Sequence, residues 1–375
     1  SVRLFFKNFV DGTNLDDRGS KKMRSFELPG RSTVHSTNGM VATSHALASE
    51  SAISVLKDGG NALDAAIAAC AVQCVVEPQS TGIGGDCFCI FSPEGSNELV
   101  AFNGSGKAPM KATIEWYKKN CITEIKRQSP HAVTVPGAID AWDTLLNNHG
   151  TKELGELLKP AIELAEEGYA ITPRVSYDWG MQKSLLENDT NAKKRFLPNN
   201  KAPQVGDVHH QPELAQTLKL IAKKGRDGFY SGEVADDIVS YLQSLGGLHT
   251  HDDFKITHGD YVTPIKTRFR DYDIFECPPN GQGVIALLLL NIMSGFESSD
   301  KNPISVERLH LEIEAGRLSY QDRNAFIADP AHATIPIEEL LASKHADFLR
   351  KHINPDAAMS NLPPTFIPKH QDTVY

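Results

Sequence analysis

Asn61–Val75, NALDAAIAACAVQCV, is almost wholly small and apolar. The preceding stretch, Ser44–Lys57, has helical spacing of its apolar residues, and Gly59-Gly60 ends it. A helix without a polar face is buried on all sides. Small Ala and Cys side chains also let neighbouring elements approach closely. The stretch therefore predicts a buried helix in a layer that packs on a sheet.

Strands are expected on both sides of this helical pair. Met40–Thr43 is a short apolar stretch, and Cys87–Phe91 and Leu99–Phe102 flank the turn residues Pro93-Glu-Gly95, as in a hairpin. Arg268–Glu276 alternates like an edge strand. Clustered strands with helices outside them favour the α+β class. The further helices expected are Ala138–Asn147, Leu154–Glu167, Pro212–Lys223, Val234–Leu245, Val284–Ser294 and Val306–Ala325.

Composition excludes several classes of partner. The 375 residues carry 38 basic and 47 acidic side chains, a net charge of −9, so nothing attracts nucleic acid or anionic lipid in general. The longest apolar run, Val284–Asn291, is far shorter than the roughly 18 residues of a membrane span. No secretory signal is visible, which favours a cytoplasmic location over a periplasmic or secreted one. We expect neither nucleic acid nor a membrane as partner.

Two groups of residues could suggest a metal site. The six cysteines have C-x3-C and C-x-C spacings that suit zinc poorly, so buried thiols are the better interpretation. His249-x-His251 has no second ligand cluster, and Thr250-x-x-Asp253 has the pattern of a helix N-cap. We expect no metal and no organic cofactor. The cysteines are Cys70, Cys74, Cys87, Cys89, Cys121 and Cys277.

Two glycine-rich strings resemble known motifs only partly. Thr81–Cys87, TGIGGDC, lacks the third glycine of a dinucleotide fingerprint and precedes a strand, so it predicts a tight turn where backbone approaches backbone. Asn103–Lys107, NGSGK, lacks the frame and the following helix of a Gly-x-Ser-x-Gly nucleophile turn. The last residues, Thr373-Val-Tyr375, look like the start of a strand. We therefore expect the chain to be a piece of something longer.

Several strings, in order, resemble one family. They include VVEPQSTGIGGDCF, AVTVPGAIDAW, CPPNGQGVIALLLLNIMSGFE and EAGRLSYQDRNAFIADP. From about Met40 to Tyr375 the chain is similar to the large-subunit region of the γ-glutamyltranspeptidases, which are N-terminal-nucleophile hydrolases. The resemblance implies a four-layer αββα sandwich, completed by a small subunit that this chain does not contain. It divides the chain into an N-terminal arm (1–39), the large-subunit part (40–372) and the first residues of the small-subunit strand (373–375).

The resemblance also implies a nucleophile. Family members are precursors, or zymogens, that cleave themselves before a threonine, and Asp372-Thr373 matches that point. Thr373 would then be the catalytic nucleophile, and its freed α-amine, with a pKa of about 8, its general base. The small subunit from the same precursor would be the partner, in a heterodimer or a dimer of heterodimers.

One departure concerns the substrate. The family loop Phe/Tyr-Arg-Glu-x-Ala-Pro supplies an Arg for the substrate's α-carboxylate, whereas Ser105 occupies that position here, with Lys107 as a partial replacement. The expected activity is hydrolysis or transfer of a γ-glutamyl amide such as glutathione, through a Thr acyl-enzyme. One alternative is an acylase acting on another small-molecule amide, such as a glutaryl side chain. Another is an unprocessed, non-catalytic precursor fragment.

Overall fold

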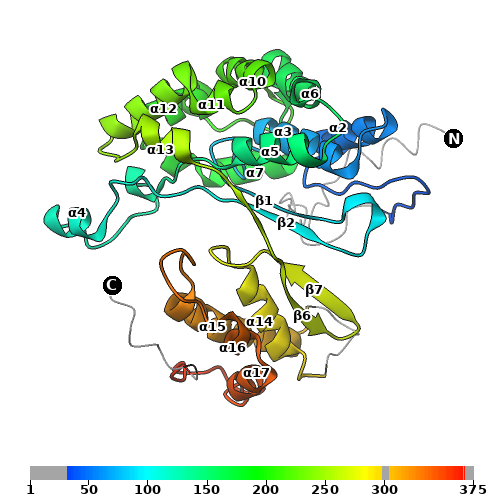
Figure 1. The fold of residues 1–375 in the computed structure, drawn as a ribbon, viewed down its shortest axis with the longest axis vertical. Coiled ribbons are helices and arrows are strands. Elements are labelled where there is room, and N and C mark those ends of the chain that lie inside the picture. The colour runs from blue at the N-terminus through cyan, green and yellow to red at the C-terminus, as the bar shows by residue number, and fades with distance from the viewer. Residues whose placement is uncertain (1–31, 298–303, 366, 368–375) are drawn as a thin grey trace, which may run out of the picture. The chain divides into compact units, whose positions relative to one another are not determined.

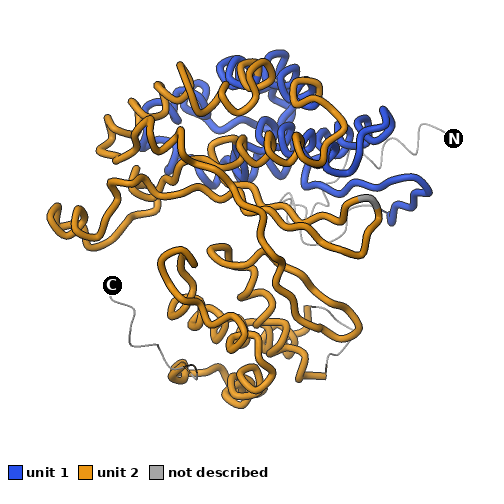
Figure 2. Tube along the Cα trace, in the orientation of Figure 1, with its two compact units in different colours: residues 1–82, 157–218 blue, residues 83–156, 219–375 orange. Residues whose placement is uncertain are grey.

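The computed structural model describes residues 32–297, 304–365 and 367. It is a mixed α/β structure in which helices predominate (Figure 1). Chain contacts divide it into unit 1, residues 1–82 and 157–218, and unit 2, residues 83–156 and 219–375 (Figure 2). None of the described helices has the length and apolar character that a membrane span requires.

Each helix expected from the sequence is present, and the structure adds several shorter helices that the sequence did not predict. The strands form small antiparallel sheets in the orders β1-β2-β5, β3-β4 and β6-β7. The strands are β1 (Cys87–Phe91), β2 (Val100–Gly104), β3 (Tyr169–Ala170), β4 (Val208–His209), β5 (Asp260–Val262), β6 (Ile265–Phe269) and β7 (Tyr272–Glu276). The helices are α2 (Ala46–Lys57), α3 (Ala62–Val76), α4 (Ile114–Lys119), α5 (Ala138–His149), α6 (Leu154–Glu167), α7 (Pro173–Met181), α8 (Lys183–Leu186), α9 (Thr190–Phe196), α10 (Pro212–Lys224), α11 (Asp227–Tyr230), α12 (Gly232–Ser244), α13 (His251–Ile256), α14 (Gly283–Met293), α15 (Val306–Phe326), α16 (Ile337–Leu341) and α17 (Ser343–Arg350).

Unit 1 is organised around α3, and the prediction of a buried helix there is confirmed. Asn61 caps it in a capping box with Asp64, which satisfies the first backbone N–H groups. Its residues are buried around most of the helix, including Ala68, Val72 and Val75. The Gln211 side chain donates to the Val75 carbonyl at 2.7 Å and so ties the end of α3 to the segment before α10.

The prediction of a strand at Met40–Thr43 is wrong. These residues have no strand partner in the described part of the chain and lead into α2 instead. Thr43 Oγ1 lies 2.7 Å from the His45 carbonyl oxygen and 2.8 Å from Ser49 Oγ. The hydroxyl group thus serves the N-terminus of the helix, and an extended segment without a ladder of inter-strand bonds is no strand.

Unit 2 contains the predicted hairpin, which is confirmed. β1 and β2 pair in the register Cys89↔Phe102, and β5 adds to the other edge of β2 through Ala101↔Val262. Phe102 is fully buried, and its ring meets that of Tyr261 edge to face at 5.0 Å. The sheet carries the end of β2 toward the N-terminus of α5.

The stretch Arg268–Glu276 is a hairpin and not a single edge strand. β6 and β7 pair through Phe269↔Tyr272, so the turn consists of Arg270 and Asp271. Arg270 has φ 53°, a left-handed conformation that usually belongs to Gly or Asn. The sequence therefore contained no turn signal. A core formed by α14, α15 and α17 follows this hairpin; its fully buried members include Val284, Leu288, Ile292 and Ala315.

Candidate active site

The loop after β2 is held by hydrogen bonds that its main-chain groups make. Asn103 Oδ1 accepts from the Ser105 N–H at 3.0 Å, and the Lys107 carbonyl accepts from the Val135 N–H at 2.9 Å. A Cβ on Gly106 would overlap the Val135 carbonyl oxygen, and one on Gly104 would lie 2.7 Å from the Ala141 Cβ. Only glycines therefore fit on either side of Ser105, and the backbone path presents that residue in a fixed position.

The turn before β1 braces the same loop. The Gly85 carbonyl accepts from two N–H groups at the start of α5, those of Gly137 and Ala138, each at 3.0 Å. The carboxylate of Asp86 accepts from the Gly106 N–H, also at 3.0 Å. The interpretation of TGIGGDC as a turn where backbone meets backbone is thus confirmed at Gly85. A Cβ on Gly82 or Gly84 would meet nothing within 4 Å, so the chain itself does not require those glycines.

A third segment, the turn between β7 and α14, contributes Asn280. The Asn103 amide donates to Asn280 Oδ1 at 2.8 Å, and the Asn280 amide donates to Ser105 Oγ at 3.0 Å. We call Asn103, Ser105 and Asn280 the Asn–Ser–Asn cluster. Its members are neutral and reach the surface: Asn280 is exposed, and the other two are half-buried. The cluster brings together two segments 175 residues apart in the sequence.

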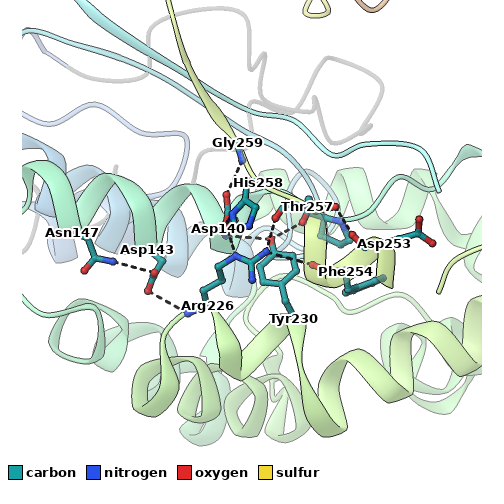
Figure 3. A network of polar contacts seen from close by, with 11 residues as sticks. Asp140, Asp143, Asn147, Arg226, Tyr230, Asp253, Phe254, Thr257, His258 and Gly259 are labelled. Carbon is teal, nitrogen blue, oxygen red and sulfur yellow. Dashed lines mark hydrogen bonds and ion pairs between the residues drawn. The ribbon is translucent and has the colours of Figure 1, made fainter. Parts of the chain in front are cut away.

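An ionic network is centred on the buried Asp140 of α5 (Figure 3). Asp140 is only 1% exposed, and its carboxylate accepts from Arg226 Nε at 2.5 Å and from the Gly259 N–H at 2.8 Å. His258 Nδ1 lies 3.1 Å from the same carboxylate. The Arg226 guanidinium stacks over the Tyr230 ring at 4.4 Å. We call these five residues the Asp140 network.

The Asp140 network positions the strand beside the loop. Tyr230 donates to the Pro136 carbonyl at 2.6 Å, and burial raises the pKa of its hydroxyl, which keeps the donor protonated. Gly259 packs so closely on Phe102 that a Cβ would lie 2.5 Å from the ring. It leads directly into β5, where Asp260 pairs with Asn103. The ionic network therefore fixes the strand next to Asn103.

The site residues predicted from sequence have different outcomes. The Ser105 side chain meets Asn280, whereas Lys107 is exposed and contributes its carbonyl group to the loop. Thr373 and Asp372 lie outside the described residues. The capping box of Thr250 and Asp253 is confirmed at the start of α13.

In the part of the chain that the structure describes, no group of three or more His, Cys, Asp or Glu side chains is placed to hold a metal ion. The cysteines are thiols, but the expectation that most are buried is only partly right. Cys74 and Cys277 are buried, whereas Cys70 and Cys121 are exposed. Small apolar neighbours in sequence do not determine which side of a helix or loop faces solvent.

Sequence reasoning missed Asn280 and the Asp140 network. The string that contains Asn280, CPPNGQG, counted only toward the resemblance, and nothing in its spacing indicated a partner on the Ser105 loop. Asp140 is the one charged residue in AIDAW, the apolar first turn of a predicted helix. A single carboxylate among apolar neighbours indicates a buried charge that needs a cation as its partner, and this signal could have identified the network.

The chain matches the family described as Gamma-glutamyltranspeptidase over residues 48–375. It is 36% identical over 343 residues to the glutathione hydrolase-like YwrD proenzyme of Bacillus subtilis, covering 92% of this chain and 64% of that protein. It is 34% identical to the acylase ACY 1 proenzyme of Pseudomonas sp. (strain SE83), covering 86% of this chain and 60% of that protein. The chain thus spans less than two thirds of these relatives' length.

Solved structures agree with this match. Helicobacter pylori gamma-glutamyltranspeptidase superposes with a TM-score of 0.81 at 30% identity, covering 92% of this chain and 100% of that chain. Cephalosporin acylase from Bacillus halodurans superposes with a TM-score of 0.80 at 38% identity, covering 89% of this chain and 63% of that chain. On this evidence the chain belongs to the gamma-glutamyltranspeptidase family.

Proposed function

We propose that this chain supplies the large-subunit part of an acyl hydrolase or transferase whose nucleophile is Thr373. The observation that carries the proposal is the family match, which extends through Asp372-Thr373 to residue 375. The Thr373 hydroxyl attacks the carbonyl carbon of an amide, and its own α-amine takes the hydroxyl proton. The C–N bond breaks, the amine leaves with that proton, and the acyl group remains as an ester. Water or an acceptor amine then resolves the ester.

The same hydroxyl group performs the processing step. In the precursor it attacks the carbonyl carbon of Asp372, which moves the acyl group from nitrogen to oxygen, and water hydrolyses the resulting ester. The relatives named above are called proenzymes, which supports processing here. The new chain beginning at Thr373 would be the small subunit and would complete the four-layer sandwich. Residues 1–39 would then form an arm outside the large-subunit region 40–372.

Two acyl donors compete in this proposal. A γ-glutamyl amide carries an α-carboxylate, which the family's Arg pairs in two parallel hydrogen bonds, and Ser105 cannot make that contact. Lys107 is an exposed point charge two residues farther along the loop. An acylase acting on another amide needs no such cation, and the similarity to two acylases supports this second candidate. Ser105 is the observation that favours it.

Processing tests the shared chemistry. We expect the full-length protein to split between Asp372 and Thr373, as measured by intact mass and by N-terminal sequencing of the smaller fragment. Thr373→Ala should remain one chain and be inactive, and Thr373→Ser should split slowly. A small fragment that begins at any other residue would disprove the assignment of the nucleophile.

A further inference from the structure

The Asn–Ser–Asn cluster has hydrogen-bonding capacity that its own contacts do not use. A carboxamide has two N–H donors. Asn103 uses one on Asn280 Oδ1, and Asn280 uses one on Ser105 Oγ. The second N–H of each amide has no acceptor in the described part of the chain. The Ser105 hydroxyl can still turn its proton outward, because its alternative contact with Asn280 Oδ1 is longer, at 3.3 Å.

These groups are held in place from two sides. The glycines beside Ser105 are packed against Val135 and Ala141. On the other segment, Pro279 and Cys277 are buried, and Cys277 Sγ lies 3.9 Å from the Cys89 carbonyl oxygen. An acyl chain reaching the cluster would therefore meet donors and acceptors already in position, which lowers the entropic cost of binding.

The charge around the cluster is unfavourable for a carboxylate. No cationic side chain contacts any of its three members within the described residues. Two charges border the cluster. The Asp86 carboxylate accepts from the N–H of Gly106, the residue after Ser105. The Arg323 guanidinium donates to Gln282 Oε1, two residues after Asn280. A substrate carboxylate placed here would be close to a like charge, whereas the Arg323 guanidinium is already engaged by the side chains of Gln282 and Asn324. An amide or hydroxyl group could instead use the cluster's donors and acceptors together.

We infer that the Asn–Ser–Asn cluster binds an uncharged, hydrogen-bonding end of the acyl group, and that Asn280 is a specificity-determining residue. This inference rests on the proposed function and narrows its substrate class. Amides whose acyl chain ends in a carboxamide or hydroxyl group are then good substrates. Glutaryl and γ-glutamyl amides, which end in charged groups, are poor ones.

The test compares anilides of four acyl groups on the processed full-length protein: 4-carbamoylbutanoyl, glutaryl, γ-glutamyl and hexanoyl. We expect kcat/KM for the carbamoyl substrate to exceed that for the glutaryl substrate at least about tenfold. Asn280→Ala should lower the carbamoyl value about five- to tenfold, the worth of one neutral hydrogen bond, and leave the hexanoyl value within about twofold. Ser105→Ala is the second variant, should Asn280→Ala fail to fold, and should act in the same direction. Asn191→Ala, an exposed asparagine on α9, is the matched control.

A binding arm separates this inference from the proposed function. Calorimetric titration with glutaramide and with glutarate needs no turnover; glutaramide should bind more tightly, and Asn280→Ala should remove the difference. If no anilide leaves an acyl group on the small fragment but this pattern holds, the proposed function is wrong, and only the cluster's preference for an uncharged ligand end stands. If glutarate binds more tightly, or if the glutaryl or γ-glutamyl anilide is the best substrate, the inference is wrong even where turnover occurs.

Discussion

Two polar clusters in unit 2 are built in opposite ways. The Asp140 network is charged, and its one carboxylate is buried and contacted from two segments, by Arg226 and by the adjacent His258 and Gly259. The Asn–Ser–Asn cluster is neutral and reaches the surface, with N–H groups left over. A buried charge must be paired, so its residues are committed to the fold. Leaving an uncharged surface amide partly unpaired costs little free energy. Such amides therefore remain available to a ligand.

The largest effect is expected in the buried cluster. Asp140→Ala leaves the Arg226 guanidinium half-buried without its carboxylate and releases the Gly259 N–H, so the full-length protein should lose about 3–5 kcal/mol of unfolding free energy. Urea unfolding monitored by fluorescence measures the loss. Asp140→Asn keeps an acceptor for Gly259 and should lose less. A loss below about 1 kcal/mol for the alanine variant would remove the distinction between the two clusters.

The next largest effect is expected when a positive charge is added to the neutral Asn–Ser–Asn cluster. Ser105→Arg adds a guanidinium where the family resemblance places one, so kcat/KM on glutathione should rise at least about tenfold, or roughly 1.4 kcal/mol. Steady-state kinetics of wild type and variant, on glutathione and on an amide lacking the α-carboxylate, gives the result. Wild-type protein that already hydrolyses glutathione efficiently, with a neutral or harmful substitution, would mean that another cation holds the carboxylate.

A smaller effect is expected at Asp143, which lies one turn after Asp140 on α5. Among the described residues, Asp143 accepts hydrogen bonds from the Arg226 backbone N–H, at 3.3 Å, and from the Asn147 amide, at 3.1 Å. Burial, opposed by these hydrogen bonds and assisted by the Asp140 charge, raises the pKa of the Asp143 carboxyl above its usual range. The folded protein therefore holds this proton more tightly than the unfolded chain, and the resulting stability is lost as pH rises through the folded-state pKa.

Asp143→Asn should accordingly gain stability relative to wild type as pH rises from about 4 to 6, by no more than about 1 kcal/mol. Thermal melts of both proteins across that interval measure the difference, with Asp178→Asn, a carboxylate on another helix, as the control. A variant that becomes less stable relative to wild type with rising pH would show that the surroundings of Asp143 stabilise its charge.

The smallest effect on stability should come from Asn280. Because its side chain is exposed and its partners can bond to water instead, Asn280→Ala should change the unfolding free energy by no more than about 0.5 kcal/mol, while substrate preference shifts. Urea unfolding, measured together with the kinetic comparison, shows whether the effect on stability and the effect on substrate preference are separate. A loss of several kcal/mol of unfolding free energy would show that the fold itself depends on Asn280.

Local patterns in the sequence predicted much of the fold but none of the polar contacts that form the site. The all-round apolar character of α3, the cap of α13 and the β1–β2 hairpin depend on neighbours in sequence, so the hydrophobic period and the capping residues indicate them. The position of Ser105 came from the family resemblance. The Arg270 turn escaped because its left-handed residue is not a glycine.

The contacts that complete the site connect distant segments and leave no periodic trace. Asn280 meets Ser105 across 175 residues, and Arg226 meets Asp140 across 86. A surface asparagine in a turn and an aspartate in the first turn of a helix are both common where no partner exists. Only the three-dimensional arrangement separates these two from ordinary instances.

The glycine-lined loop around Ser105 has a consequence for how such a protein can diverge. Because main-chain atoms of Gly104, Gly106 and Val135 set the loop's path, the side chain at position 105 can be exchanged without moving its support. On the proposed function, single substitutions at position 105 would then change which acyl group is preferred while the scaffold stays intact. A lineage built this way can acquire new substrates through single steps and without an unstable intermediate.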